Sequence, residues 1–354
     1  MKPMIAITMG DPAGIGPEII VKAFSKPLVN RIERAGRFVV VGDRGVLEKT
    51  ARRIKHAPGL RAVPDPEAVR AAQNVLSVID LKNVDLRRLA VGRPGAAGGR
   101  AAVGAIRTAV ELALARRVAA IVTAPISKEG LHAAGYPFPG HTELLAELTG
   151  SPAVGMLMAA NLPKTIRPRL APQLRILLAT THVAIRDLPE RLTRECVETA
   201  IRLAHDAAVR YFGLRRPRLA VAGLNPHAGE AGLFGREEFE TIGPAVEQAR
   251  RDGLPVAGPF PADSLIRRAV EGKYDLVVAM YHDQALIPIK LLGFGRAVNV
   301  TVGLPFVRTS PDHGTAYDIA GKGVADPSSL IEAIRLAAAL AKKRKIGRAP
   351  HPFA

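Results

Sequence analysis

Three histidines occupy the same place in the local pattern of the chain, because each comes just after a short run of apolar, β-branched residues. They are His182, His227 and His282, and Asp263 and Asp283 supply carboxylates nearby. Such runs are typical of buried parallel strands, whose ends can converge at one edge of a sheet. A lone histidine of this kind is more often a structural residue, but three in equivalent positions favour a metal site.

Neutral imidazole ligands favour Zn²⁺, Co²⁺ or another borderline ion over Ca²⁺. Three neutral ligands leave the charge of a dication uncompensated, so an alkoxide or carboxylate of a substrate could complete the shell. A structural zinc is normally closed by four protein ligands. The open arrangement therefore fits Lewis-acid catalysis better.

A second group of side chains suits an anion such as phosphate. Lys290 follows the third histidine, Asn299 lies within a β-branched run at 297–302, and Arg308 follows that run. Polar groups collected beyond strand ends indicate a ligand site in an open α/β sheet. Any one of them could instead be a capped or paired loop residue.

Two further segments place polar residues after strands or at helix starts. His141 and Thr142 open a predicted helix, where free N–H groups suit a phosphate, although a threonine at this place normally caps the helix. Ser127 and Lys128 follow another predicted strand and are candidates of second rank.

The elements that must position these residues alternate between strand and helix, which predicts an α/β fold with a largely parallel sheet. Strands are expected at 4–9, 37–41, 75–80, 118–123, 153–159, 174–180, 218–223, 275–280 and 297–302. Helices are expected after residue 16, at 98–117, from 140 through 148, at 188–212 as one helix of about 25 residues, and at 328–343. Cys196 and His205 lie on the face of the 188–212 helix and are given no role.

A glycine-rich turn at 10–18 lacks the third glycine of a dinucleotide fingerprint, because Ile19 stands in its place. It is a weak dinucleotide signal, but its N–H groups and Asp11 could face a ligand. No P-loop motif occurs in the sequence, which argues against a P-loop kinase or ATPase.

Composition limits the class of protein. The chain has 354 residues, 48% of them hydrophobic, enough for two domains or one bilobed unit. No apolar run is long enough to span a membrane and no signal peptide is visible; with the single Cys196, this predicts a cytoplasmic enzyme. The net charge is +18, but arginines are dispersed and aromatic residues make up only 4%, which argues against nucleic-acid binding.

Eight motifs occur in order across nearly the whole chain: MGDPAGIGPE at 9–18, TAPISK at 123–128, GHTE at 140–143, TTH at 180–182, LNPHAGE at 224–230, GPFPADS at 258–264, YHDQ at 281–284 and RTSPDHGTA at 308–316. In these motifs the chain resembles the family of 4-hydroxythreonine-4-phosphate dehydrogenases of pyridoxal phosphate biosynthesis. The resemblance implies a bilobed α/β/α fold akin to isocitrate and isopropylmalate dehydrogenases. One lobe would comprise 1–135 plus about 300–354 and the other about 136–299, with the active-site cleft between them.

The resemblance also implies site residues and cofactors. The metal ligands would be His182, His227 and His282, and the substrate would be bound by His141, Thr142, Lys290, Asn299 and Arg308. The cofactors would be NAD or NADP, bound without the Rossmann fingerprint, and a divalent metal, Zn²⁺ or alternatively Mg²⁺ or Co²⁺. The family forms homodimers whose active site draws residues from both subunits.

The implied reaction is oxidation of 4-phosphooxy-L-threonine at C3, followed by decarboxylation to 3-amino-2-oxopropyl phosphate. Lys290 and Asp283 are the candidates for taking the alcohol proton. A paralogue acting on D-threonate or D-erythronate 4-phosphate would keep the same residues. A dihydrodiol dehydrogenase would not need Lys290 and Arg308 for a phosphate, a phosphate acetyl- or butyryltransferase would need no metal, and a basic nucleic-acid-binding protein would bind duplex in a salt-dependent way.

Overall fold

The computed structural model describes residues 2–26, 28–70, 72–162, 171–293 and 295–343. The chain divides into two compact units: unit 1 is Met1–Ser151 with Leu304–Lys342, and unit 2 is Pro152–Gly303 with Lys343–Ala354. The predicted lobe boundaries, and the cleft between the lobes, stay a prediction. Each unit is described by itself.

Unit 1 contains a parallel sheet in which the strand order is β3-β4-β2-β1-β5-β12. The strands are β1 (Met4–Thr8), β2 (Arg37–Gly42), β3 (Gly59–Ala62), β4 (Val75–Asp80), β5 (Ala120–Thr123) and β12 (Val307–Pro311). The central strands are almost continuous apolar runs, as expected for a parallel sheet that is covered on both faces.

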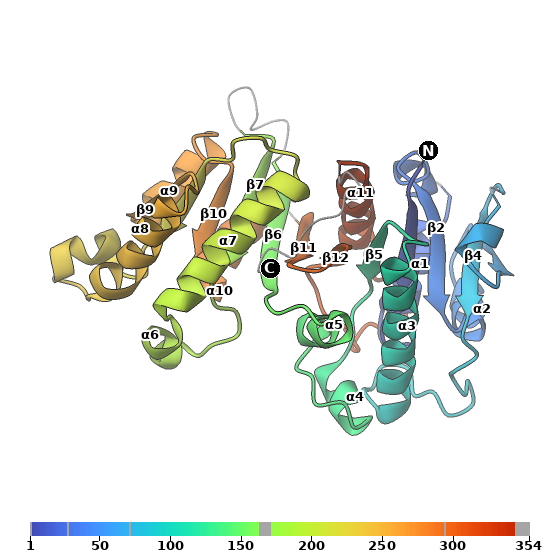
Figure 1. Ribbon diagram of the computed structural model, residues 1–354. Helices are drawn as coiled ribbons and strands as arrows, with labels where there is room; N and C mark the ends of the chain where they lie inside the picture. The colour runs from blue at the N-terminus through green and yellow to red at the C-terminus, as the bar shows by residue number, and fades with distance from the viewer. Residues whose placement is uncertain (1, 27, 71, 163–170, 294, 344–354) are drawn as a thin grey trace. The chain divides into compact units, whose positions relative to one another are not determined.

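The helices of unit 1 are α1 (Gly16–Ala23), α2 (Arg44–Ala51), α3 (Ala96–Leu114), α4 (Lys128–Ala133), α5 (His141–Thr149) and α11 (Ser328–Lys343), with short 3₁₀ turns η1 (Leu28–Arg31) and η2 (Pro66–Ala68). The Ala-rich α3 lies across β1, β2 and β5 (Figure 1). α2 and β3 lie between the predicted strands at 37–41 and 75–80, where the sequence predicted no element.

Unit 2 has a mixed sheet of order β11-β6-β7-β10-β8-β9. Its strands are β6 (Gly155–Asn161), β7 (Gln173–Leu178), β8 (Leu219–Ala222), β9 (Val256–Phe260), β10 (Leu276–Ala279) and β11 (Ala297–Val302). β6 runs antiparallel to both β11 and β7, and the remaining pairs are parallel. The predicted largely parallel α/β sheet is therefore confirmed, with β6 as the exception in this unit.

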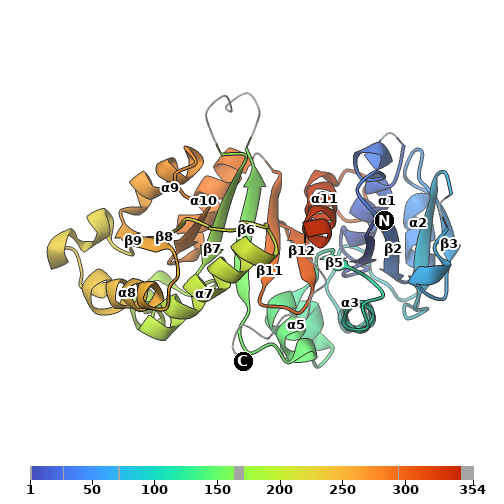
Figure 2. The same cartoon turned by 45° about the horizontal axis from the view of Figure 1, so that its top comes forward.

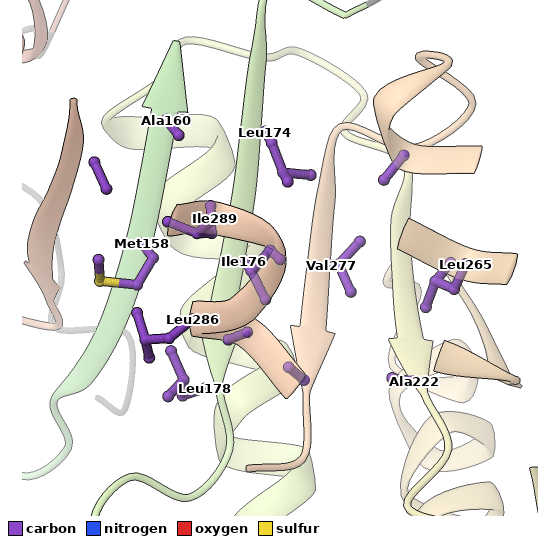
Figure 3. Packing of buried hydrophobic residues seen from close by; sticks show 14 of the residues in the cluster. Met158, Ala160, Leu174, Ile176, Leu178, Ala222, Leu265, Val277, Leu286 and Ile289 are labelled. Carbon is purple, nitrogen blue, oxygen red and sulfur yellow. The ribbon is translucent and has the colours of Figure 1, made fainter. Parts of the chain in front are cut away.

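Helices cover both faces of this sheet. They are α6 (Leu188–Arg191), α7 (Arg194–Arg210), α8 (Gly243–Arg251), α9 (Ala262–Val270) and α10 (His282–Gly293), with the turns η4 (Ile185–Asp187), η5 (Pro226–Gly232) and η6 (Glu238–Ile242, a π-helical turn). α9 and α10 lie on one face and α7 on the other (Figure 2). Figure 3 shows Leu286 and Ile289 of α10 against Met158 and Ile176 in the buried cluster.

The prediction of one helix over 188–212 is wrong. The helix breaks between α6 and α7, where the Thr193 side chain accepts a hydrogen bond from the Cys196 N–H at 3.1 Å. A threonine used as an N-cap has extended backbone angles and so begins a new helix.

Among the described residues, no helix combines the length and the apolar character that a membrane crossing requires.

Candidate functional site

The three strands that precede the predicted metal ligands are neighbours in the sheet of unit 2. β10 lies between β7 and β8 and runs parallel to both. His182, His227 and His282 follow the carboxyl ends of β7, β8 and β10. All three therefore come after neighbouring strand ends, the region where α/β sheets bind ligands.

Hydrogen bonds continue the pairing of β7 with β10 beyond the strands. The Thr180 N–H and hydroxyl both donate to the Met280 carbonyl, at 3.2 and 2.7 Å. Each of these residues lies two positions before a histidine. The imidazoles of His182 and His282 are accordingly close, with ring centroids 5.8 Å apart and planes inclined by 40°.

The residues after His282 orient its ring and fix the start of α10. His282 Nδ1 is hydrogen-bonded to Asp283 Oδ1 at 2.7 Å, and a carboxylate at Nδ1 leaves Nε2 as the acceptor that can bind a metal. The Gln284 side chain accepts from the Met280 N–H at 2.7 Å and donates to the Gly223 carbonyl at 2.8 Å. The end of β8 is thereby tied to the start of α10.

His227 lies in an unusual backbone segment. His227, Ala228, Gly229, Glu230 and Ala231 all have positive φ, between 42° and 83°. A left-handed conformation costs about 1–2 kcal/mol for each L-residue with a side chain. Such strain persists only where surrounding contacts hold it, and it occurs often at functional sites.

The described residues contain no group of three His, Cys, Asp or Glu side chains that could hold a metal ion together. His227 is exposed, and its ring centroid lies 6.2 Å from that of Phe234. The structure thus brings two of the three predicted ligands together and does not add His227 to them. The metal role of His227 stays a prediction.

In unit 1 the predicted anion-binding residue Arg308 is a buried cation. The Arg308 side chain on β12 is only 2% exposed, and its Nε and Nη2 donate to Thr123 Oγ1 at 3.1 and 2.6 Å. Burial lowers the pKa of Arg308 to about 9, opposed by the charge of Glu143. The guanidinium therefore remains a cation at pH 7.

His141, at the start of α5, lies in the field of that guanidinium. Burial, and then the Arg308 charge, holds the pKa of His141 well below its usual value, so the imidazole is neutral at pH 7. Its Nε2 is buried without a hydrogen-bond partner, and Asn299 Oδ1 of unit 2 is in the same condition. An unsatisfied buried polar atom costs about 1–3 kcal/mol, which a bound ligand could recover.

The remaining candidates have simpler surroundings. α5 has Gly140 as its N-cap residue, without a side-chain cap, so Thr142 does not cap the helix. Ser127 does cap α4, because its Oγ accepts from the Gly130 N–H at 3.1 Å. Lys290 is exposed in the last turn of α10.

Three separate motifs of unit 1 meet around the glycine-rich turn. The Asp11 N–H donates to the Pro125 carbonyl at 2.9 Å, and the Ile15 N–H donates to the Thr315 carbonyl at 2.9 Å. Tyr317 Oη donates to Asp11 Oδ2 at 2.7 Å. The Asp11 side chain is buried and joins the turn to its neighbours, and its role toward a ligand stays a prediction.

Residues 34–337 match the family described as "Pyridoxal phosphate biosynthetic protein PdxA". The chain belongs to the PdxA family.

Relatives within the PdxA family span nearly the whole chain. A 4-hydroxythreonine-4-phosphate dehydrogenase of Desulforapulum autotrophicum is 44% identical over 337 residues, which cover 95% of this chain and 95% of the relative. A D-threonate 4-phosphate dehydrogenase of Cupriavidus necator is 46% identical, with 97% of this chain and 98% of the relative covered. The crystal structure of a 4-hydroxythreonine-4-phosphate dehydrogenase of Klebsiella pneumoniae has a TM-score of 0.86 at 45% identity, covering 96% of this chain and 98% of that one.

Membership of the PdxA family confirms the predicted family resemblance, and the dehydrogenase names of these relatives confirm the expectation of an enzyme.

No role was predicted from the sequence for two residues with functional features. His313 has a buried Nε2 without a hydrogen-bond partner, and its place in the RTSPDHGTA motif was the available signal. Glu238 is buried beside the His227 segment, and no sequence pattern indicated it.

Proposed function

We propose that this chain oxidises 4-phosphooxy-L-threonine at C3 with NAD⁺ or NADP⁺ and releases CO₂ to form 3-amino-2-oxopropyl phosphate, in pyridoxal phosphate biosynthesis. The observation that carries the chemistry is the close pair of imidazoles, His182 and His282, beyond two neighbouring parallel strands. The PdxA family and the names of its members support the substrate class.

The donor set fits a divalent metal. His182 and His282 would hold the ion together with His227, and Asp283 orients one of the imidazoles for this role. Zn²⁺ or Co²⁺ suits three neutral nitrogen ligands, and Mg²⁺, which prefers oxygen ligands, is a further alternative. Such an ion lowers the pKa of a bound alcohol and stabilises negative charge that develops on a neighbouring oxygen.

The phosphate of the substrate would be held by His141, Thr142 and Arg308, with Lys290 and Asn299 as further binding residues. The support is the charge that the buried Arg308 keeps at pH 7 and the unsatisfied Nε2 of His141, which can donate to an oxyanion in the appropriate tautomer. Binding at a group remote from C3 orients the reacting carbon and lowers the entropic part of the barrier.

Two residues were predicted as acceptors for the alcohol proton. The carboxylate of Asp283 already bonds to His282 Nδ1 at 2.7 Å, which supports an orienting role for this residue. Lys290, exposed in the last turn of the same helix, stays the other candidate for taking the alcohol proton.

A homodimer would complete the site. Close to His227 in sequence lie three exposed apolar residues: Leu233 is 74% exposed, Phe234 47% and Phe239 68%. Apolar side chains clustered on one segment are typical of a surface that a partner covers. We propose that the partner is a second copy and that His227 binds the metal of the other subunit.

A second candidate is oxidation of D-threonate or D-erythronate 4-phosphate. Its support is that relatives named D-threonate 4-phosphate dehydrogenase match this chain at 46% identity over at least 95% of its length. This reaction would use the same metal and phosphate residues and would differ where the C2 amine or hydroxyl is recognised.

The test is reduction of NAD⁺, followed by absorbance, with 4-phosphooxy-L-threonine and with D-threonate 4-phosphate, before and after EDTA treatment. We expect turnover of the amino substrate that chelation abolishes and Zn²⁺ or Co²⁺ restores. Turnover of the sugar acid alone would establish the second candidate. Activity that survives thorough chelation would refute the metal assignment.

A further inference from the structure

We propose that Glu238 is a positioning residue, which holds the left-handed turn at 227–231 and thereby sets the direction of the His227 imidazole. The inference rests on the proposed metal role of His227. Glu238 lies outside every motif used above, and its side chain does not need to touch substrate or metal to act in this way.

The Glu238 carboxylate is only 5% exposed and binds the backbone just before the turn. Its Oε1 accepts from the N–H groups of Leu224 and Asn225, each at 2.7 Å, and its Oε2 accepts from Asn225 Nδ2 at 3.0 Å. In the described part of the chain no lysine or arginine forms an ion pair with it. Its buried charge is therefore balanced by amide donors, all on the segment that leads to His227.

Glycines around the carboxylate leave no room for side chains. A Cβ at Gly229 would lie 2.7 Å from Glu238 Oε2, and a Cβ at Gly223 would lie 2.9 Å from Glu238 Oε1. A Cβ at Gly235 would clash with Asn225 Nδ2. The turn is thus wrapped closely around one side chain, which is the local contact that can hold five consecutive residues at positive φ.

Glu238 itself comes from a well-anchored element. It begins the π-helical turn η6, which leads directly into α8, where Ala245, Val246 and Ala249 are buried. The carboxylate therefore has a fixed position relative to the sheet. Because the His227 side chain is exposed, its placement depends on the turn that carries it.

Substitution of Glu238 by glutamine is nearly isosteric and tests the role without a large cavity. The glutamine oxygen can still accept from Leu224 and Asn225, but its NH₂ group would face the donor Asn225 Nδ2. The matched control is Glu240→Gln, which removes the same charge two residues away. The Glu240 side chain is 60% exposed and pairs with Arg236.

The experiment is titration of the metal-free full-length protein with Co²⁺, followed by visible absorption, for wild type, E238Q, E240Q, H227A and the double variant E238Q/H227A. Limited chymotrypsin digestion of the metal-free proteins reports on the segment around Phe234, and circular dichroism reports on folding. We expect E238Q to weaken Co²⁺ binding by about tenfold or more, as changes beside metal ligands typically do, and to increase cleavage at Phe234 without loss of folding.

E240Q should match wild type in both readouts, and E238Q should cause no further loss of Co²⁺ affinity in the H227A background, because Glu238 acts through His227. Wild-type affinity and cleavage in E238Q would overturn the inference and leave the proposed function intact. An equal loss on top of H227A would also overturn it, since Glu238 would then act elsewhere. If H227A alone binds Co²⁺ like wild type, the metal role of His227 fails and the inference fails with it.

Discussion

At the scale of single residues, the unusual feature of unit 1 is a neutral histidine beside a buried cation. Burial, and then the charge of Arg308, lowers the pKa of His141 well below 6.5. The unfolded chain therefore takes up this proton more readily than the folded chain. The contribution of His141 to the free energy of unfolding is therefore present above about pH 6.5. It is lost as the pH falls toward the pKa that His141 has in the folded protein.

His141→Gln should remove this dependence on pH. We expect the slope of the unfolding free energy against pH, measured by urea denaturation between about pH 5 and 7, to fall by up to about 1.4 kcal/mol per pH unit. His141→Asn, which also cannot titrate, should give the same slope as glutamine. Slopes that match wild type in both variants would mean that His141 is protonated as easily in the folded protein as in the unfolded chain.

From the sequence, the identity of the site residues was easier to predict than their surroundings. His182 and His282 were found from strand-end positions, because parallel neighbours bring such positions together. The field of Arg308 on His141 could not be predicted, since it depends on how β12 and α5 pack in unit 1. The hydrogen bond from Tyr317 to Asp11 could not be predicted either, because the two residues are remote in the sequence.

At the scale of elements, α10 carries both site residues and core residues on one helix. Ile289 is completely buried against the sheet, whereas Ile287, two residues earlier, is 63% exposed (Figure 3 shows Ile289 in the cluster). The same substitution at these two positions separates packing from surface effects. Ile289→Ala should lower the free energy of unfolding by about 2–5 kcal/mol, and Ile287→Ala should change it by less than about 0.5 kcal/mol.

Urea unfolding of the two variants under identical conditions provides the measurement, and wild type provides the reference. A large loss for Ile287→Ala would show that this side chain is buried in the assembled protein, which would place a partner against α10. A small loss for Ile289→Ala would mean that the cluster closes around the smaller side chain.

Elements with strong patterns were predictable nearly to the residue. β11 and α11 have the bounds that alternation and helical spacing predicted, at 297–302 and 328–343. β3 was missed because most of its residues are exposed and it has no apolar pattern. The left-handed turn could not be foreseen, because the buried Glu238, which accepts hydrogen bonds from the two residues before Pro226, lies beyond the segment itself.

At the scale of the whole molecule, the separation of His227 from the other two histidines makes a prediction about assembly. His182 and His282 are close within one chain, the described residues contain no group of three ligands, and exposed apolar side chains follow His227 in sequence. If two copies share each site, two different inactive variants should complement one another. His227→Ala and His282→Ala should each be inactive alone and regain activity when unfolded together and refolded as a mixture.

The expected recovery follows from the symmetry of a dimer. Half of the dimers in a random mixture contain one variant of each kind. In each of these, one site combines an intact His182–His282 pair with an intact His227 from the other chain, while the second site lacks both. Recovery should therefore approach roughly a quarter of wild-type activity. His182→Ala mixed with His282→Ala is the matched control. Each variant chain then has a damaged His182–His282 pair, so no combination of chains gives a complete site. Recovery in the control, or none in the first mixture, would contradict a site in which only His227 crosses between subunits.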